Sequence, residues 1–252
     1  VAGLLPPDWN IRLADENVRP VSDEDLRFAD VVMISAMLVQ RDGLFAIAKR
    51  ARALGKIVAA GGPYVTSAPD EVLAAGCDFV VTGEGEGTIP LLVRAIEEGR
   101  PGGVIAVEEK TDMEHVPLPR FDLVDPRDYD AMPVQTSRGC PFACEFCDVI
   151  NLFGRTPRYK SSSQVVAELA AILDTGHRGS VFFTDDNFIG NPKRARELLK
   201  AVAAWNRAHG EPFWFITQAS VNLGGSPELI DLMTAANFGY VFVGIESPDT
   251  EV

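Results

Sequence analysis

Three of the four cysteines in this 252-residue sequence lie in one short stretch, RGCPFACEFC, at residues 138–147. Cys140, Cys144 and Cys147 have the spacing Cys-x3-Cys-x2-Cys, and they follow a strand that we predict at 134–137. Three thiolates on one tight loop can bind three irons of a [4Fe–4S] cluster, which leaves the fourth iron free to bind a small molecule. The stretch therefore predicts an iron–sulfur site on a loop that follows a β-strand.

Other uses of these cysteines fit the sequence less well. A structural zinc site usually has four ligands, and none of the three histidines, at positions 115, 177 and 209, is close to the cysteines in sequence. A catalytic thiol would need only one cysteine and a basic partner. A disulfide framework is typical of smaller chains in oxidising compartments. We therefore expect a reducing, cytoplasmic location.

The residues after the cysteines alternate predicted strands with predicted helices. Three further strands are predicted at 180–184, 213–217 and 239–244. The helices between them are predicted from residues that favour the N-cap: Ser161, Asn191 and Ser226. Successive βα units are typical of a (β/α) TIM barrel, so residues 134–252 are predicted to form the first part of such a barrel.

Residues 1–108 show the same alternation with shorter elements. Strands are predicted at 31–34, 57–60 and 79–81, and helices at 44–54, 71–75 and 88–98. This order predicts a Rossmann-like α/β domain with a parallel sheet and helices on both faces. Residues 109–133 contain four prolines and are predicted to be a linker. Because the sequence begins with Val and ends just after a predicted strand, we expect both domains to be incomplete, the first lacking its N-terminal strand.

The bulk composition excludes some classes of partner. The formal net charge is −13, with acidic residues spread along the whole sequence, whereas a nucleic-acid-binding surface needs a basic face. No stretch reaches the roughly 18 consecutive apolar residues of a membrane-spanning helix. The N-terminus also lacks the basic and apolar regions of a secretory signal. We expect neither a nucleic-acid partner nor a transmembrane segment.

Polar residues follow each predicted strand of the barrel, where active-site residues of barrels lie. Asp185 and Asp186 follow the second strand, Gln218 and Ser220 the third, and Glu246 the fourth. Adjacent carboxylates repel one another unless a cation is near, although Asp is also common at an ordinary helix N-cap. Three basic residues follow the cysteines and are interpreted as a solvated loop: Arg155, Arg158 and Lys160.

The cysteine stretch closely resembles the signature of the radical S-adenosylmethionine (SAM) superfamily, Cys-x3-Cys-x-aromatic-Cys, with Phe146 as the aromatic residue. The resemblance implies that the three cysteines bind a [4Fe–4S] cluster, that SAM chelates its fourth iron, and that Phe146 lies beside the adenine. It also implies that Asp186, with Asp185 beside it, meets the ammonium group of SAM. Gln218, Ser220 and Glu246 would then hydrogen-bond its ribose or carboxylate.

The first domain resembles the cobalamin-binding domain that precedes the barrel in one branch of this superfamily. The resemblance implies that Ser35, Gly61 and Gly62 lie along the nucleotide tail of cobalamin. The Asp-x-His-x-x-Gly loop that carries a cobalt-ligating histidine in other cobalamin folds is absent from this sequence. Several stretches, among them 117–122 and 185–191, look most like the subgroup that contains hopanoid C-2 methylases. Gln218 departs from the Glu expected there.

The resemblance implies that the cluster cleaves SAM to a 5′-deoxyadenosyl radical and that cobalamin supplies a methyl group to an unactivated carbon. The substrate would be a lipid, an isoprenoid or another small molecule, and an external one-electron reductant of the flavodoxin or ferredoxin type would be required. Two alternatives remain open. One is a radical cyclase or oxidoreductase that does not methylate, and the other is an electron carrier or sensor that binds the cluster and corrinoid without catalysis.

Overall fold

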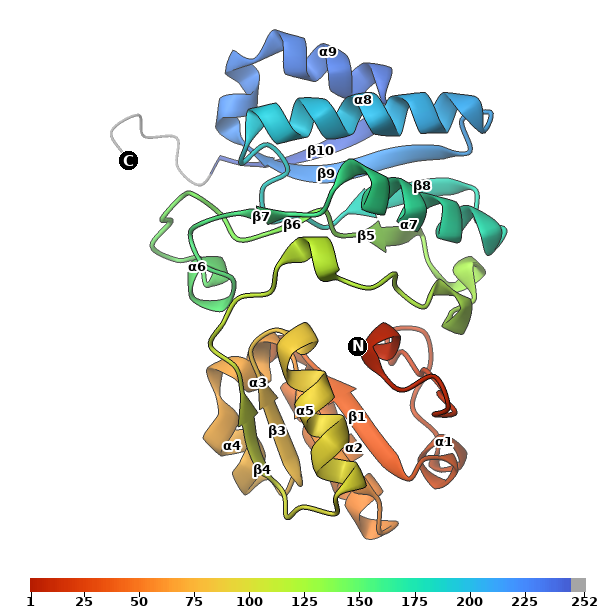
Figure 1. The fold of residues 1–252 in the computed structure, drawn as a ribbon, viewed down its shortest axis with the longest axis vertical. Helices are drawn as coiled ribbons and strands as arrows, with labels where there is room; N and C mark the ends of the chain where they lie inside the picture. Colours follow the sequence, from red (N-terminus) through yellow and green to blue (C-terminus); the bar gives the residue numbers. More distant parts are fainter. Residues whose placement is uncertain (246–252) are drawn as a thin grey trace. The chain divides into compact units, whose positions relative to one another are not determined.

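The computed structural model describes residues 1–245, which form two compact units with their boundary between Thr111 and Asp112 (Figure 1). The boundary falls inside the predicted linker, 109–133, and residues 112–133 of it contribute to the second unit. The side chains of Met113 and Phe121 are buried, and Phe121 packs in the core of that unit. The prolines of this segment therefore separate short turns that are fixed to the fold by apolar side chains.

The first unit contains a four-stranded parallel sheet in sequence order. Its strands are β1 (Val31–Ser35), β2 (Ile57–Gly61), β3 (Phe79–Thr82) and β4 (Gly103–Ala106). The three predicted strands are present, and β4 is additional. Because all the strands run in one direction, their carboxyl ends form a single edge, at which open α/β sheets bind ligands.

Helices cover both faces of this sheet. They are α1 (Asp23–Phe28), α2 (Arg41–Ala53), α3 (Pro63–Ser67), α4 (Pro69–Ala74) and α5 (Gly85–Glu97). Val58 and Ala60 pack with α1 to α4 on one face. Phe79 and Val81 pack with α5 on the other, where the N-terminal residue Trp9 also contributes. Side chains that alternate between two apolar layers are expected of a sheet that is buried on both faces.

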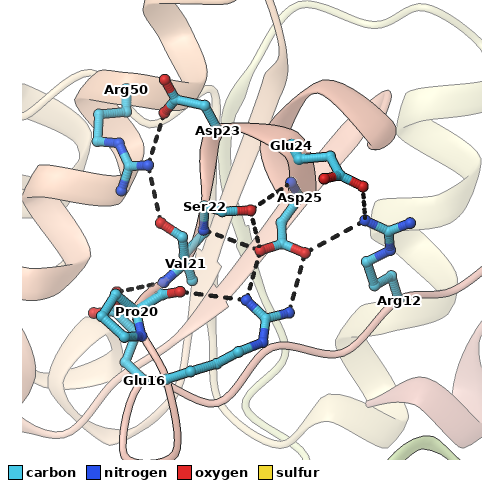
Figure 2. Close-up of polar contacts among 10 residues, drawn as sticks. Arg12, Glu16, Pro20, Val21, Ser22, Asp23, Glu24, Asp25 and Arg50 are labelled. Carbon is cyan, nitrogen blue, oxygen red and sulfur yellow. Dashed lines mark hydrogen bonds and ion pairs between the residues drawn. The ribbon is translucent and has the colours of Figure 1, made fainter.

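The N-terminal segment is fixed to α1 by a polar network (Figure 2). Ser22 caps α1 by accepting a hydrogen bond from the backbone N–H of Asp25, whose carboxylate accepts one in return from the backbone N–H of Ser22. Arg19 donates to the same carboxylate over 2.7 Å, and Arg50 on α2 donates to Asp23 over 2.7 Å. The hydrogen bonds from Arg19 and Ser22 lower the pKa of the Asp25 carboxyl, with that from Arg19 contributing most.

The second unit contains a parallel sheet of β5 (Ala131–Val134), β8 (Gly179–Phe183), β9 (Phe213–Ser220) and β10 (Phe238–Gly244), adjacent in that order. The first strand begins three residues before the predicted 134–137. Pro133 concealed it, but a proline is tolerated because β5 has only one neighbour, β8, among the described strands. Residues 137–138 belong instead to a short antiparallel ladder, β6 (Ser137–Arg138) with β7 (Arg158–Tyr159).

Among residues 112–245, the helices of the second unit cover one face of its sheet. They are α7 (Ser162–Asp174), α8 (Pro192–Ala208) and α9 (Pro227–Ala235), and a one-turn helix, α6 (Val149–Leu152), lies in the loop between β6 and β7. Leu169, Leu199 and Met233 from the three long helices pack on Phe183 and Phe215 of the sheet. Figure 1 shows α8 and α9 lying along β9 and β10. A parallel sheet with helices on one face is the wall of a barrel, whose other face lines the interior.

The interior face of this wall is partly apolar and open among the described residues. Tyr240 and Phe242 on β10 are 70% and 68% exposed, and the register places Gln218 beside Phe242 and Ile216 beside Tyr240. The predicted architecture, a Rossmann-like domain followed by part of a TIM barrel, is confirmed.

Two of the three predicted N-caps form as expected. Ser161 makes a capping box with Gln164, and the Asn191 side chain accepts from two backbone N–H groups of α8. Ser226 precedes α9 but makes no side-chain cap. Short 3-10 segments complete the described structure, at Ala2–Leu4, Leu38–Gln40, Met113–His115, Phe121–Leu123, Pro126–Asp128 and Val221–Gly225. No helix in the described part of the chain has the length and apolar character needed to span a membrane.

Candidate functional site

The three clustered cysteines lie on the loop between β6 and β7. The ladder pairs Ser137 with Tyr159 and Arg138 with Arg158, and the backbone N–H of Cys140 donates to the carbonyl of Gly154 over 3.3 Å. Gly139 has a φ of +94°, and a Cβ there would lie 2.8 Å from the same Gly154 carbonyl. Only glycine fits this position without strain, so the local sequence brings the two sides of the loop together just before the first cysteine.

The three cysteine thiols of the loop differ in exposure. Cys144 is exposed, whereas Cys140 and Cys147 are partly buried. Burial is the main factor that raises the pKa of the Cys140 thiol, and the charges of Asp186, Cys147 and Cys144 raise it further. The other two thiols and the Asp186 carboxylate are therefore close enough to act on Cys140 through electrostatics.

The donor set fits an iron–sulfur cluster. Within residues 1–245, no three His, Cys, Asp or Glu side chains converge closely enough to enclose a single metal ion. A cluster places each thiolate on a different iron, so its ligands need not converge on one point. The fourth cysteine, Cys77, is buried in the core of the first unit, and burial raises its pKa to about 11. Cys77 therefore has the surroundings of a packing residue.

Asp186 faces the cysteine loop. Its residue is exposed, yet partial desolvation by the surrounding chain raises the pKa of its carboxyl, while a hydrogen bond from the backbone of Gly139 lowers it. This bond connects the turn after β8 to the residue immediately before Cys140. An exposed carboxylate beside a cysteine loop is suitable for binding a cationic group.

Asp185 has a different environment, and the predicted contact with SAM is not supported by it. None of its surface is exposed. Its carboxylate accepts from the backbone N–H of Thr136 at 3.1 Å, from the Thr136 hydroxyl at 2.8 Å and from the Ser137 hydroxyl at 2.5 Å. Burial raises the pKa of Asp185 to about 6, and these hydrogen bonds oppose the rise. The side chain is thus used within the fold, by the residues that begin the cysteine loop.

The next strand end is tied to the same turn. Asn187 is buried; its amide donates to the Ser220 hydroxyl over 3.0 Å, and its oxygen accepts from the backbone N–H of Ser220 over 3.3 Å. The Ser220 hydroxyl also bonds Asn222. Gln218 is partly buried, and its backbone carbonyl accepts from the N–H of Phe188. Glu246, the remaining predicted residue of this group, lies outside the described residues.

Two other residues, Phe146 in the cysteine loop and Lys160 just after it, differ in exposure. Phe146 is 71% exposed, so its ring is available to pack against a ligand. Lys160 was interpreted as part of a solvated loop, which is wrong: its side chain is buried and makes an ion pair with the buried Glu168 of α7. Glu168 lies three residues after Val165 and four before Ile172, on the core-facing stripe of α7. A charged residue in an apolar stripe is the signal that could have identified the pair.

The predicted cobalamin residues meet at the carboxyl edge of the first sheet. Ser35 ends β1 and is paired in register with Gly61, which ends β2. Gly62 has a φ of +98°, and a Cβ there would lie 2.7 Å from the Ser35 hydroxyl oxygen. Ser35 is exposed. Because these residues are small and lie at the carboxyl edge of a parallel sheet, a ligand can approach their backbone closely. This arrangement fits an extended nucleotide tail.

Comparison with known families gives a match for each of the two parts of the chain. The Radical SAM superfamily model matches residues 134–252, and the B12 binding domain model matches residues 8–93. The chain thus carries a radical SAM domain and a B12-binding domain. The cofactors implied by these two domains are a [4Fe–4S] cluster, SAM and cobalamin, as predicted from the sequence.

Relatives of this radical SAM chain include named methyltransferases. An uncharacterized methyltransferase of Synechocystis sp. is 51% identical over all of this chain and 47% of its own length. The hopanoid C-2 methylase of Rhodopseudomonas palustris is 38% identical over 99% of this chain and 48% of its own length. The chain thus spans about half the length of these curated relatives.

A solved structure shares the fold. The radical SAM methyltransferase TsrM from Kitasatospora setae, with cobalamin and a [4Fe–4S] cluster bound, superposes with a TM-score of 0.70. The match covers 90% of this chain and 53% of that one, at 20% sequence identity. At this identity the likeness establishes the arrangement of the backbone and leaves the roles of individual residues to be tested.

Proposed function

We propose that the protein to which this chain belongs is a cobalamin-dependent radical SAM methyltransferase that acts on an unactivated carbon of a lipid, an isoprenoid or another apolar small molecule. The observation that carries the proposal is the position of Asp186, an exposed carboxylate after β8 that accepts a hydrogen bond from the backbone of Gly139, immediately before Cys140. The named relatives add support, because they are methyltransferases that match over this chain.

In the second unit, Cys140, Cys144 and Cys147 would hold the cluster. When bound, the cluster supplies the electron that cleaves SAM to a carbon radical. Asp186 would accept hydrogen bonds from the ammonium group of SAM, and the exposed ring of Phe146 would cover the adenine. Gln218 and Ser220 lie at the next strand end, where they would orient the ribose or carboxylate. Glu246 is proposed for the same task from the sequence alone.

In the first unit, Ser35, Gly61 and Gly62 would border the nucleotide tail of cobalamin. No histidine is present in residues 1–111, so this unit would hold the corrinoid without a histidine ligand to cobalt from those residues. The open interior face of the second unit, with Tyr240 and Phe242, suits an apolar substrate. An external one-electron reductant would supply the cluster.

The test uses the full-length protein, reconstituted anaerobically with iron, sulfide and cobalamin. With SAM, a reductant and an isoprenoid lipid extract, it is expected to form 5′-deoxyadenosine and a product heavier by one methylene. Deuterium from methyl-labelled SAM should appear in that product. Absence of 5′-deoxyadenosine from a cluster-loaded sample, across a range of lipid and small-molecule extracts, would contradict the proposal. Deoxyadenosine with an unmethylated product would instead identify a radical cyclase or oxidoreductase.

A further inference from the structure

The cysteine loop has two legs, residues 136–138 before it and residues 158–160 after it. The legs are joined by the β6–β7 pairing and, at their base, by a hydrogen bond from the N–H of Lys160 to the carbonyl of Thr136, 2.9 Å long. Pairing between the legs fixes them to each other. It does not fix the hairpin to the rest of the unit, so other contacts must determine where the cysteines lie.

The first leg is fixed by Asp185. The sheet ladder between β5 and β8 ends with the N–H of Thr184 bonded to the carbonyl of Val134. Beyond that point the chain leaves the sheet, and the Asp185 carboxylate takes up the backbone N–H of Thr136 and the hydroxyls of Thr136 and Ser137. All three residues are buried. Loss of this acceptor would leave a buried backbone N–H unpaired, which is costly.

The second leg is fixed by Glu168. Lys160, the last residue of this leg, is 8% exposed, and its ammonium group pairs with Glu168, which is 2% exposed, in the middle of α7. Breaking a buried pair by removing one partner is strongly destabilising because the other charge remains buried. The carboxylate therefore holds residue 160 against a helix that is itself packed in the core through Val165, Leu169 and Ile172.

We propose that Asp185 and Glu168 are positioning residues for the cysteine loop, one for each leg, and that neither contacts a cofactor. The proposal rests on the proposed function only in taking residues 140–147 as the part that binds the cluster. The two carboxylates differ in charge balance. Glu168 is paired with a cation, whereas the donors on Asp185 are neutral hydroxyl and backbone N–H groups. Asp185 therefore brings a net negative charge close to the loop, and Glu168 does not.

The first test measures hydrogen exchange in the full-length protein without added iron. Asp185→Asn is expected to increase exchange in peptides covering both legs, residues 136–138 and 158–160, relative to peptides covering β2. Glu168→Gln is expected to act mainly on residues 158–160. The matched control is Glu228→Gln, because Glu228 is an exposed carboxylate on helix α9, 3.6 Å from Arg196. It should leave exchange in both legs unchanged.

A milder pair of variants at Thr136 distinguishes a local effect on the legs from general unfolding. Thr136→Val removes one hydroxyl donor to Asp185 and keeps the backbone donor, whereas Thr136→Ser keeps both. Faster exchange of the legs in Thr136→Val, restored in Thr136→Ser, is the expected result. Unchanged exchange in Asp185→Asn, Glu168→Gln and Thr136→Val would overturn the proposal.

The second test separates position from charge in the cluster-loaded protein. At pH 8, Asp185→Asn is expected to raise the reduction potential of the cluster, since a buried negative charge disappears nearby. Thr136→Val should lower the iron content without shifting the potential of the clusters that form. Equal potentials in wild type and Asp185→Asn would contradict the placement of this charge. If the wild type binds no cluster at all, the proposed function fails, and hydrogen exchange still decides whether the carboxylates fix the legs.

Discussion

The carboxyl edges of the two sheets carry different kinds of residue. In the first unit the edge consists of Ser35, Gly61 and Gly62, which are small, uncharged and partly open to solvent. In the second unit the corresponding edge carries Asp185 and Asp186, of which one is fully buried. Both edges lie where parallel sheets bind their ligands. They differ in whether the residues at the strand ends are exposed or are buried beneath a loop.

The ligands proposed for the two edges would account for this difference. A ligand that lies along the backbone needs positions without side chains, and glycine provides them. The cost is entropic, because glycine loses more conformational freedom on folding than other residues do. A loop that carries metal ligands needs a rigid support, and buried hydrogen-bonded carboxylates provide it at the cost of desolvation. At the first edge the small residues let a ligand approach the backbone. At the second edge buried hydrogen bonds hold the loop in place.

The largest expected effect comes from the loop that the second edge supports. Cys140→Ala in the full-length protein should reduce the iron content after reconstitution to background and abolish 5′-deoxyadenosine formation, because a cluster ligand is lost. The measurements are iron and sulfide per chain and the amount of deoxyadenosine. Cys77→Ala is the matched control; its thiol lies in the core of the first unit, and this variant should keep its cluster. Equal iron loss in both variants would argue against a specific role for residues 140–147.

The next effect is the pH dependence that Asp185 contributes. Its pKa rises from 3.8 in the unfolded chain to about 6 in the fold, so the folded state holds the proton more tightly. The contribution to stability is fully present below pH 3.8 and falls as the pH rises through 6, by roughly 3 kcal/mol. Hydrogen exchange of α7 and β8 should therefore show the second unit losing stability over this range. Asp185→Asn should lack this component, and an identical pH profile would refute the assignment.

The first edge is probed by Gly62→Ala. A methyl group there would meet the Ser35 hydroxyl and force an unfavourable left-handed backbone. Cobalamin affinity is expected to fall about tenfold or more, equivalent to roughly 1.4 kcal/mol or more, while iron content stays at the wild-type level. The control is Gly55→Ala, at which φ is +70° but nothing lies within 4 Å of the added Cβ. If Gly55→Ala weakens cobalamin binding equally, the effect is one of general backbone strain.

The smallest effect compares one capping motif in both units. Ser22 and Ser161 each form a capping box at the start of a helix, as Figure 2 shows for Ser22. Replacement by Ala should cost about 1 kcal/mol of local stability in either place. Ser161 directly follows the second leg of the cysteine loop, so only Ser161→Ala should increase hydrogen exchange at 158–160. If Ser22→Ala also increased exchange at residues 158–160, the effect would not come from the position of Ser161 next to the second leg.

The sequence predicted the longer helices and most strands around both edges, because their apolar periodicity and caps are local signals. The short elements α1, α3, β4, β6 and β7 were not predicted. Boundaries were missed where tertiary pairing decides them. The sequence 131–134 became β5 despite Pro133, since that strand has a single described neighbour. The loop at Lys160 was interpreted as solvated because its partner, Glu168, is eight residues away on another element.

The two aspartates show what a finer interpretation of the sequence could have added. Both have the same local signal, a carboxylate after a buried strand. Side chains alternate between the faces of a strand, and Val181 and Phe183 are fully buried on the helix-covered face. Continued alternation places Asp185 on that buried face and Asp186 on the other. The identity of the donors, Thr136 and Ser137, depends on the neighbouring strand and is not visible in the local sequence.

The hydrogen bond between Cys140 and Gly154 has a consequence for metal uptake. It closes the chain around the cysteines with groups of the protein alone, so the entropy lost in closing that loop is independent of iron. Three thiols confined in this way act as one chelator, and once the first sulfur has bound iron, the other two are present at a high effective concentration. Cluster assembly at this loop should therefore be cooperative in the ligands, with partly coordinated iron species short-lived.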